Sequence, residues 1–380
     1  MRTTTASLGK NLPPADLEKA SLLTCALCAS EDVETYSDDE DRKLAASDLG
    51  SSRQDVSHGK ILRCRACRFG FRQSRPAEEE LSALYRKLDP NVYEKESRGR
   101  LNTAQRHLKI VQRYVQGGRL LDVGCASGAF LRCAADAGWS VVGVEPAEVL
   151  CAKAQQMLSG RGEVFCIPLQ QADLPASSFD ALTLWDVLEH VPDPRTFLRH
   201  CASLLKPGGY LFANVPDLDS LQARLLRGRW PLLLAEHLNY FNRRSLKLCG
   251  ELAQLHWVDF GRRPASFSLE YVLYRLAQHR VPGASLGHKF TGKTFLGEIC
   301  IPAFLGESYG VWTLPLQNPI WTEERLEPSE IHSRDRRASW RWLRWYAWFA
   351  RISSRPWGFD EGRGLAQVCE LLLRGGCREI

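Results

Sequence analysis

The stretch Arg119-Leu-Leu-Asp-Val-Gly-Cys-Ala-Ser-Gly-Ala-Phe-Leu131 decides the fold class. Leu120, Leu121 and Val123 form a short apolar run that is typical of a strand buried on both faces. Small residues from Gly124 to Gly128 then predict a tight turn, and the last three residues begin a helix. Strand, turn and helix in this order bring backbone N–H groups against a nucleotide-like ligand in α/β folds. The turn alone is a weak signal for the kind of ligand, which depends on the chain beyond it.

Alternating apolar and amphipathic segments follow the turn. Further strands are expected at Val141–Glu145, Val164–Ile167, Phe179–Trp185, Tyr210–Val215 and Leu255–Phe260, with helices between the early ones. This alternation predicts an α/β fold, a doubly wound, Rossmann-like, seven-stranded and mostly parallel sheet that binds its ligand at the carboxyl ends of the strands. A last strand is expected around Cys300–Pro302.

A carboxylate stands at the end of the second strand. Glu145 lies 17 residues beyond Gly128 (145 minus 128), close to where a ribose-binding acid follows a glycine turn in dinucleotide sites. Its two oxygens can accept both hydroxyls of a ribose. The Gly-x-Gly-x-x-Gly pattern is absent, which disfavours a phosphate-binding dinucleotide site.

Five motifs occur in order and carry a resemblance: Leu-Leu-Asp122-Val-Gly124-Cys-Ala-Ser-Gly128, Val-Glu145-Pro, Phe179-Asp180, Trp185-Asp186-Val-Leu-Glu189-His190 and Leu205-Lys-Pro-Gly-Gly209. Over roughly residues 116–308 the chain resembles class I S-adenosylmethionine (SAM)-dependent methyltransferases. Within them it is most similar to the group that contains ubiquinone-biosynthesis O-methyltransferases and many bacterial small-molecule and sugar enzymes.

The resemblance implies a SAM site. Asp122 and the turn would hold the methionine part, Glu145 the ribose, and Asp186 would lie beside the cofactor. The turn departs from the family at its middle glycine, which is Ala126 here and tightens the fit, so the implied turn residues are Gly124, Ala126 and Gly128. The acidic residue often found near the adenine is replaced by an apolar stretch around Leu169, which implies backbone and apolar contacts there.

A hydroxyl acceptor needs its proton removed by a base, or by a cation that lowers its pKa. His190, next to Glu189, is the leading base candidate, and His237 is the second. Together with Asp186 these residues resemble the acid-x-x-Glu-His plus distal His set of metal-dependent relatives, which implies a site for Mg²⁺ or another divalent ion. Three interpretations stay open: metal-assisted catalysis, a metal-free base, and a purely structural Glu-His pair.

Two C-x-x-C pairs stand near the amino terminus. Cys25 and Cys28 are separated from Cys64 and Cys67 by the 35 residues 29–63. Four thiolates suit a tetrahedral structural zinc with no open position for chemistry. The gap is longer than in zinc ribbons, and an acidic, Ser-rich insert from Glu31 to Asp55 can absorb the excess. Phe69 and Phe71 are expected to give this module its apolar contact with the next domain.

Composition describes a globular chain with a modest excess of positive charge. Of 380 residues, 44% are hydrophobic and 25% charged, with a formal net charge of +6, which does not by itself indicate nucleic-acid binding. We expect no signal peptide and no spanning helix. Most of the 13 cysteines stand singly in apolar settings, such as Cys133, Cys166 and Cys201, which favours free thiols, a reducing compartment and a cytoplasmic location.

The resulting domain plan has five segments: a flexible tail (1–21), a zinc-ribbon-like module (22–75), a helical linker (76–115), the methyltransferase domain (116–308) and an Arg/Trp-rich extension (309–380). Residues 310–380 hold seven of the 11 tryptophans. Trp340–Arg351 can form a helix that is compatible with lying in a membrane interface, but the preferred interpretations are a helix that docks on protein or a poorly ordered extension.

The sequence therefore predicts a SAM-dependent methyltransferase that acts on oxygen of a small molecule, a quinone-like ring or a sugar. The alternatives are C-methylation of a nucleotide sugar, metal-dependent 2′-O-methylation of RNA, and a non-catalytic zinc- and SAM-binding module. Arg224, Arg227 and Arg229 can meet an anionic substrate or simply face solvent. Oligomeric state is left open.

Overall fold

The computed structural model of the chain describes residues 24–40, 44–45, 57–76, 78–86, 97–262, 265–270, 272–273, 287, 291, 299–303 and 305–316. The predicted tail, the Trp340–Arg351 helix and most of the C-terminal extension lie outside these residues. The chain divides into two units, and all elements discussed below belong to the first, Met1–Tyr271 with Phe295–Asn318. Among the described residues, no helix is long and apolar enough to cross a bilayer.

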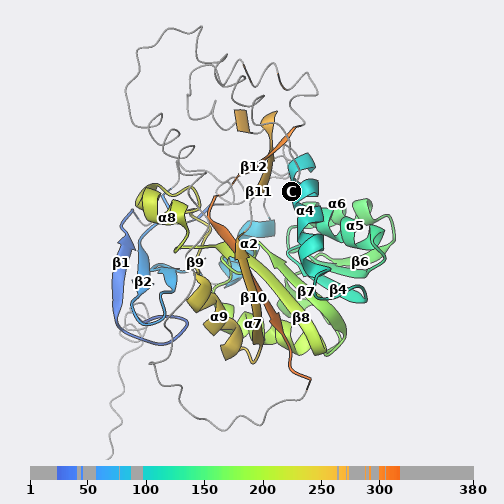
Figure 1. The fold of residues 1–380 in the computed structure, drawn as a ribbon, viewed down its shortest axis with the longest axis horizontal. Coiled ribbons are helices and arrows are strands. Elements are labelled where there is room, and N and C mark those ends of the chain that lie inside the picture. Colours follow the sequence, from blue (N-terminus) through green and yellow to red (C-terminus); the bar gives the residue numbers. More distant parts are fainter. Residues whose placement is uncertain are drawn as a thin grey trace, which may run out of the picture. The chain divides into compact units, whose positions relative to one another are not determined.

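A seven-stranded sheet forms the centre of this unit, in the order β10-β13-β8-β7-β4-β5-β6 (Figure 1). Its strands are β4 (Arg119–Val123), β5 (Ser140–Val144), β6 (Gly162–Phe165), β7 (Phe179–Trp185), β8 (Leu205–Pro216), β10 (His256–Arg262) and β13 (Glu307–Thr313). β13 is antiparallel to both its neighbours, and the pairs from β8 to β6 are parallel. The predicted fold class is confirmed, and the chain order reverses between β4 and β7, where such sheets bind ligands.

Helices cover both faces of the sheet, as the buried strands require. The helices are α2 (Glu78–Arg86), α4 (Ser97–Val111), α5 (Ala129–Asp136), α6 (Glu148–Leu158), α7 (Pro194–Leu204), α8 (Leu221–Leu226) and α9 (Arg243–Leu252). Leu120 packs in a core with α4, α5 and α6, whereas Leu121 packs in a second core with α7 and α9. The apolar residues of β4 thus pack in two cores, one on each face of the sheet.

Two expectations about the later strands were wrong. The last strand of the sheet is β13, whereas Cys300–Ala303 forms β12 and pairs with β11 (Ala265–Ser268) in a separate two-stranded ribbon. The strand expected at Tyr210–Val215 begins five residues earlier, so the Lys206–Gly209 segment lies within β8. It bulges inside β8, because Phe179 and Ala181 pair with Leu205 and Tyr210 and leave four residues between.

The amino-terminal cysteine module forms a four-stranded antiparallel sheet of β1 (Val33–Ser37), β2 (Ile61–Cys64), β3 (Gly70–Arg72) and β9 (Asn239–Tyr240). The last strand comes from the chain segment beyond β8, so the module is closed by the domain it precedes. Phe69 and Phe71 are buried, and the Phe69 ring lies 5.0 Å from that of Phe241. Their expected apolar contact with the next domain is confirmed.

The cysteine assignment needs one correction. Cys166 was expected to be a free thiol, but it forms a disulfide with Cys151 of α6. The pairing links α6 to the segment that follows β6, and the sequence separation of 15 residues between the two cysteines gave no sign of their proximity. Cys133 and Cys201 are free and buried, as expected.

Candidate functional site

The turn between β4 and α5 is built from left-handed backbone. Gly124 and Gly128 have φ angles of 71° and 82°. A Cβ on Gly128 would lie 2.9 Å from the Cα of Ala154 on α6, so only glycine allows this close helix packing. Ala126 also takes a positive φ, 48°, a conformation that costs a non-glycine residue about 1 kcal/mol.

Glu145 connects the end of β5 to this turn. Its side chain is buried, and its two oxygens accept hydrogen bonds from the backbone N–H groups of Ala126 and Ala147, each at 2.9 Å. Burial raises the pKa of Glu145 to about 7. Each oxygen keeps a second lone pair, so the carboxylate can still accept two hydroxyls.

Asp122 lies at the end of β4, fully buried, and accepts a hydrogen bond of 2.7 Å from the hydroxyl of Thr183 on β7. Burial and the nearby Glu145 carboxylate raise its pKa to about 7. Asp186 follows β7 with a φ of 57°. Its carboxylate accepts from the Asn214 amide at 2.6 Å, and its N–H donates to Asn214 Oδ1 at 2.7 Å.

The three predicted catalytic residues come together beyond β7. Potential ligand atoms of Glu189, His190 and His237 all lie within 4.8 Å of one another. The two imidazole rings meet edge to face, with centroids 4.8 Å apart. Asp186 was expected in the same set, but in the described structure it pairs with Asn214 and is not part of this compact group.

Hydrogen bonds orient both imidazoles. Nδ1 of His190 lies 3.0 Å from the carbonyl oxygen of Glu236, and Nδ1 of His237 lies 3.0 Å from that of Leu232. Because a carbonyl only accepts, each Nδ1 carries the proton and each Nε2 has a free lone pair in the neutral ring. This arrangement is common among metal-binding histidines and also suits a general base.

The cluster is largely buried and has several carboxylates near it. Glu189 is buried, and its Oε2 has no hydrogen-bond partner among the described residues. Burial, followed by the charges of Asp186, Glu307 and Glu236, raises the pKa of Glu189 well above its usual value. Burial lowers the pKa of both histidines. A buried carboxyl among like charges favours either a proton or a bound cation.

Helix α2 joins the turn to the cluster. Leu84 and Tyr85 of α2, like Ala126 of the turn, pack against Ala147 and Leu150. The Tyr85 ring also lies edge-on to His190, with centroids 6.3 Å apart. The turn at β4 and the cluster beyond β7 therefore share one cover. Leu169, in the 3-10 turn after β6, is buried in the core, and its contact with adenine stays a prediction.

The four cysteines of the module also converge, with all four sulfurs within 4.8 Å of one another. The Sγ atoms of Cys25 and Cys67 lie 3.5 Å apart, and those of Cys28 and Cys64 lie 3.6 Å apart. Each C-x-x-C pair is followed by a residue with left-handed backbone, Ala29 or Arg68. The N–H of Cys67 faces the sulfur of Cys64. The Cys67 thiol lowers the pKa of Cys25 by hydrogen bonding. Four sulfurs in this arrangement can hold a tetrahedral zinc.

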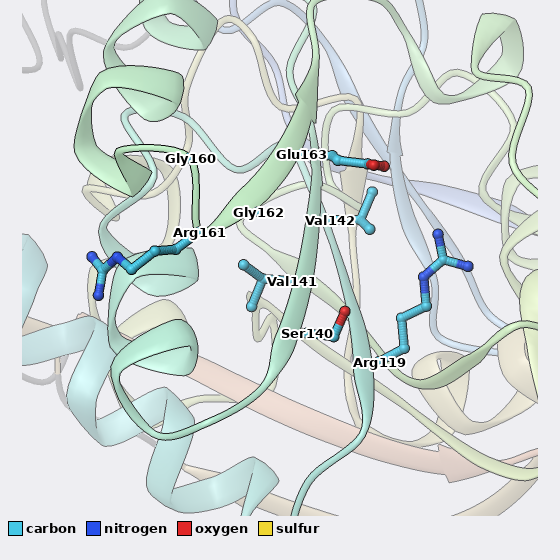
Figure 2. Close-up of a pocket in the computed structure, with 8 residues that line it drawn as sticks. All are labelled: Arg119, Ser140, Val141, Val142, Gly160, Arg161, Gly162 and Glu163. Carbon is cyan, nitrogen blue, oxygen red and sulfur yellow. The ribbon is translucent and has the colours of Figure 1, made fainter.

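A groove of about 280 Å³ lies at the opposite edge of the sheet (Figure 2). Its lining contains the first residues of β4, β5 and β6, namely Arg119, Ser140 and Gly162. In Figure 2 the Arg119 and Arg161 side chains lie on opposite sides of two valines. Because the turn and the cluster follow the carboxyl ends of the strands, this groove is remote from both.

Sequence reasoning missed the residues that hold the site in place. Thr183 and Asn214, which bond Asp122 and Asp186, are both fully buried, on β7 and β8. Asn214 stands at the carboxyl end of its strand, a position that could have marked it. Asn239 and Arg75, which are joined by a hydrogen bond, carry no such signal in the sequence.

A doubly wound sheet, a glycine turn at its reversal point and a buried acid after the second strand define a nucleotide-binding α/β domain. Residues 96–259 match the family described as a methyltransferase domain. The chain therefore contains a SAM-dependent methyltransferase domain.

Two ubiquinone biosynthesis O-methyltransferases are similar to part of the chain. The protein from Bordetella avium (strain 197N) is 40% identical over 102 residues, 26% of this chain and 42% of the relative. The protein from Idiomarina loihiensis is 41% identical over 100 residues, 25% and 41% of the two chains. The matched part thus spans less than half the length of these relatives. A SAM-dependent methyltransferase structure from Methanosarcina mazei has a TM-score of 0.38 at 19% identity and covers 55% of this chain and 98% of that one.

Proposed function

We propose that this protein transfers the methyl group of SAM to an oxygen of a small molecule, a quinone-like ring or a sugar. The observation that carries the proposal is the Glu189–His190–His237 cluster, which shares the cover of α2 with the β4–α5 turn. The names of the two relatives favour an oxygen acceptor on a ring.

Each part of the proposed cofactor site has a physical role. The turn from Gly124 to Gly128 and the Asp122 carboxylate would hold the methionine moiety, and Glu145 would accept the ribose hydroxyls. Asp186 would lie beside the sulfonium, and Leu169 beside the adenine. Transfer is an in-line displacement: the acceptor oxygen forms a bond to the methyl carbon, and the sulfur keeps the electron pair of the broken bond.

The acceptor hydroxyl must lose its proton to Glu189 or to a histidine Nε2 of the cluster. We further propose that Glu189, His190 and His237 hold a divalent cation, because the buried Glu189 carboxyl stands among like charges and both Nε2 lone pairs are available. When bound, the cation would lower the pKa of the acceptor hydroxyl. The residues would then orient the acceptor and exclude water.

The methyl-transfer proposal is tested with labelled SAM and extracts of small molecules, comparing wild type with Glu189→Gln and His190→Ala. We expect both variants to lose about 100-fold or more in kcat, because general acid-base catalysis contributes about 10²- to 10⁴-fold. Affinity for S-adenosylhomocysteine should stay unchanged by calorimetry. Glu163→Gln, on the exposed surface of β6, is the matched control. Wild-type turnover in both cluster variants would contradict the assigned chemistry.

Metal content tests both metal proposals separately. We propose a structural zinc on Cys25, Cys28, Cys64 and Cys67, and elemental analysis of the purified protein should find one zinc per chain that Cys64→Ser removes. A second divalent ion should bind with measurable heat and be lost in His237→Ala, with zinc retained. A zinc-free wild type refutes the cysteine site, and equal binding of the second ion to His237→Ala refutes the cluster site.

We also propose a cytoplasmic enzyme with a small-molecule acceptor. Outside the cysteine module, Cys125, Cys133, Cys201 and Cys249 are buried free thiols, which supports a reducing location. The proposal of peripheral membrane contact through the Arg/Trp-rich extension rests on composition alone. Membrane fractionation tests this proposal. Protein that is found with membranes and released by high salt supports the contact, and absence of the protein from the membrane fraction contradicts it.

A further inference from the structure

We infer that Arg75 is a positioning residue that connects the cysteine module to the Glu189–His190 turn, so that the module is a working part of the acceptor site. The importance of that turn rests on the proposed function. Arg75 lies eight residues after Cys67, and the contacts of its guanidinium group support this role.

Arg75 points its guanidinium at two acceptors of the methyltransferase domain. It donates to Oδ1 of Asn239 at 3.0 Å and to the carbonyl oxygen of Pro192. The guanidinium carbon lies 5.6 Å from the centre of the Phe71 ring, which fixes the side chain from the module side. Burial lowers the pKa of Arg75 to about 10, so the group stays charged at neutral pH.

Asn239 passes this constraint to the turn. The residue is fully buried, and its amide nitrogen donates to the carbonyl oxygens of Leu188 at 3.0 Å and Val191 at 2.6 Å. Its backbone N–H donates to the carbonyl of Glu189 at 3.0 Å. One side chain thus ties both ends of the segment that carries Glu189 and His190. With its only side-chain acceptor held by Arg75, the amide cannot flip without losing these bonds.

The same module also holds the segment of His237. The Arg72 N–H donates to the carbonyl of Leu238 at 3.0 Å, and its guanidinium donates to that of Ala235 at 2.8 Å. Strand β3 pairs with β9 immediately afterwards. Arg72 and Arg75 therefore bracket both histidines from one short stretch of the module.

The test is a set of substitutions with a spectroscopic readout. In Arg75→Met we expect kcat to fall about 10- to 100-fold, because the variant loses hydrogen bonds from a charged group. The dissociation constant of S-adenosylhomocysteine should stay within about twofold of the wild-type value. Arg75→Lys should recover part of kcat, and added guanidinium should partly rescue Arg75→Met. Arg65→Met is the matched control, because Arg65 is exposed and pairs with Asp32 and Glu34 on the module surface.

Histidine-ring NMR of the substrate-free protein supplies the independent measurement. The ring signals of His190 and His237, assigned with His→Gln variants, should move in Arg75→Met and Arg75→Lys and stay in place in Arg65→Met. Unmoved signals in Arg75→Lys together with wild-type kcat would overturn the inference, even if Arg75→Met fails to fold. Moved signals in a protein without methyl-transfer activity would support the positioning role and reject the proposed function.

Discussion

Glu145 shows how one residue can serve both the fold and the proposed ligand. Its oxygens accept two backbone N–H groups that fix the turn, which offsets part of the cost of burying a carboxylate. Burial nevertheless raises its pKa to about 7, above the value of an unfolded glutamate. The stability that this group contributes is therefore full below about pH 4.5 and is lost as pH rises through about 7.

We predict that binding of S-adenosylhomocysteine near pH 7 releases protons, because ribose hydroxyls stabilise the ionised form of Glu145. Glu145→Gln should weaken binding about 10- to 100-fold, the worth of hydrogen bonds to a charged group, and should reduce the proton release. Calorimetry in buffers of different ionisation enthalpy measures both. Glu163→Gln on the next strand serves as control. Undiminished proton release in Glu145→Gln would assign the titration to Asp122 instead, whose pKa is also about 7.

At the scale of elements, the turn after β4 is specified by backbone geometry. Gly128 combines a positive φ with close approach to α6, whereas Gly138, after α5, has a similar φ of 87° and no atom near its missing Cβ. Alanine at Gly138 would therefore meet only the cost of the left-handed backbone, whereas alanine at Gly128 would also clash with α6. Ala126 shows that the turn accepts strain at one position when the N–H is bonded to Glu145.

Gly138→Ala is expected to lower the free energy of unfolding by about 1 kcal/mol. Gly128→Ala should lower it by a further 1–3 kcal/mol, roughly the cost of overpacking, and should also abolish stabilisation by S-adenosylhomocysteine. Urea unfolding with and without the ligand measures both quantities. Equal losses in the two variants would show that α6 moves aside and that packing does not require glycine here.

At the scale of the whole molecule, the cysteine module and the segment after β8 form one sheet. β9 pairs with β3, and the Asn242 amide donates to the carbonyl of Arg68 beside the second cysteine pair at 3.2 Å. Neither part completes its hydrogen bonds without the other. The two should therefore unfold as one cooperative unit.

Removing the proposed zinc with a strong chelator is expected to lower the melting temperature in a single calorimetric transition and to reduce methyl transfer. Affinity for S-adenosylhomocysteine should change much less, because β4 and β5 pair with strands of the seven-stranded sheet and not with β3. Restored melting after addition of zinc, but not magnesium, is the control. Two separate transitions, with the higher one unaffected by chelation, would show that the module is only an appendage.

The sequence by itself determined the α/β class, the order of the early strands, the tight glycine turn after β4, and the pairing of cysteines into two C-x-x-C turns. These signals are local: apolar runs, glycines and short spacings express backbone preferences within a few residues. The structure alone decided that the last strand is β13, that Cys166 pairs with Cys151, and that Asp186 bonds Asn214 apart from Glu189 and the histidines. Asn239 and Arg75 are 164 residues apart in sequence, and no local pattern records a contact that only the packed chain creates.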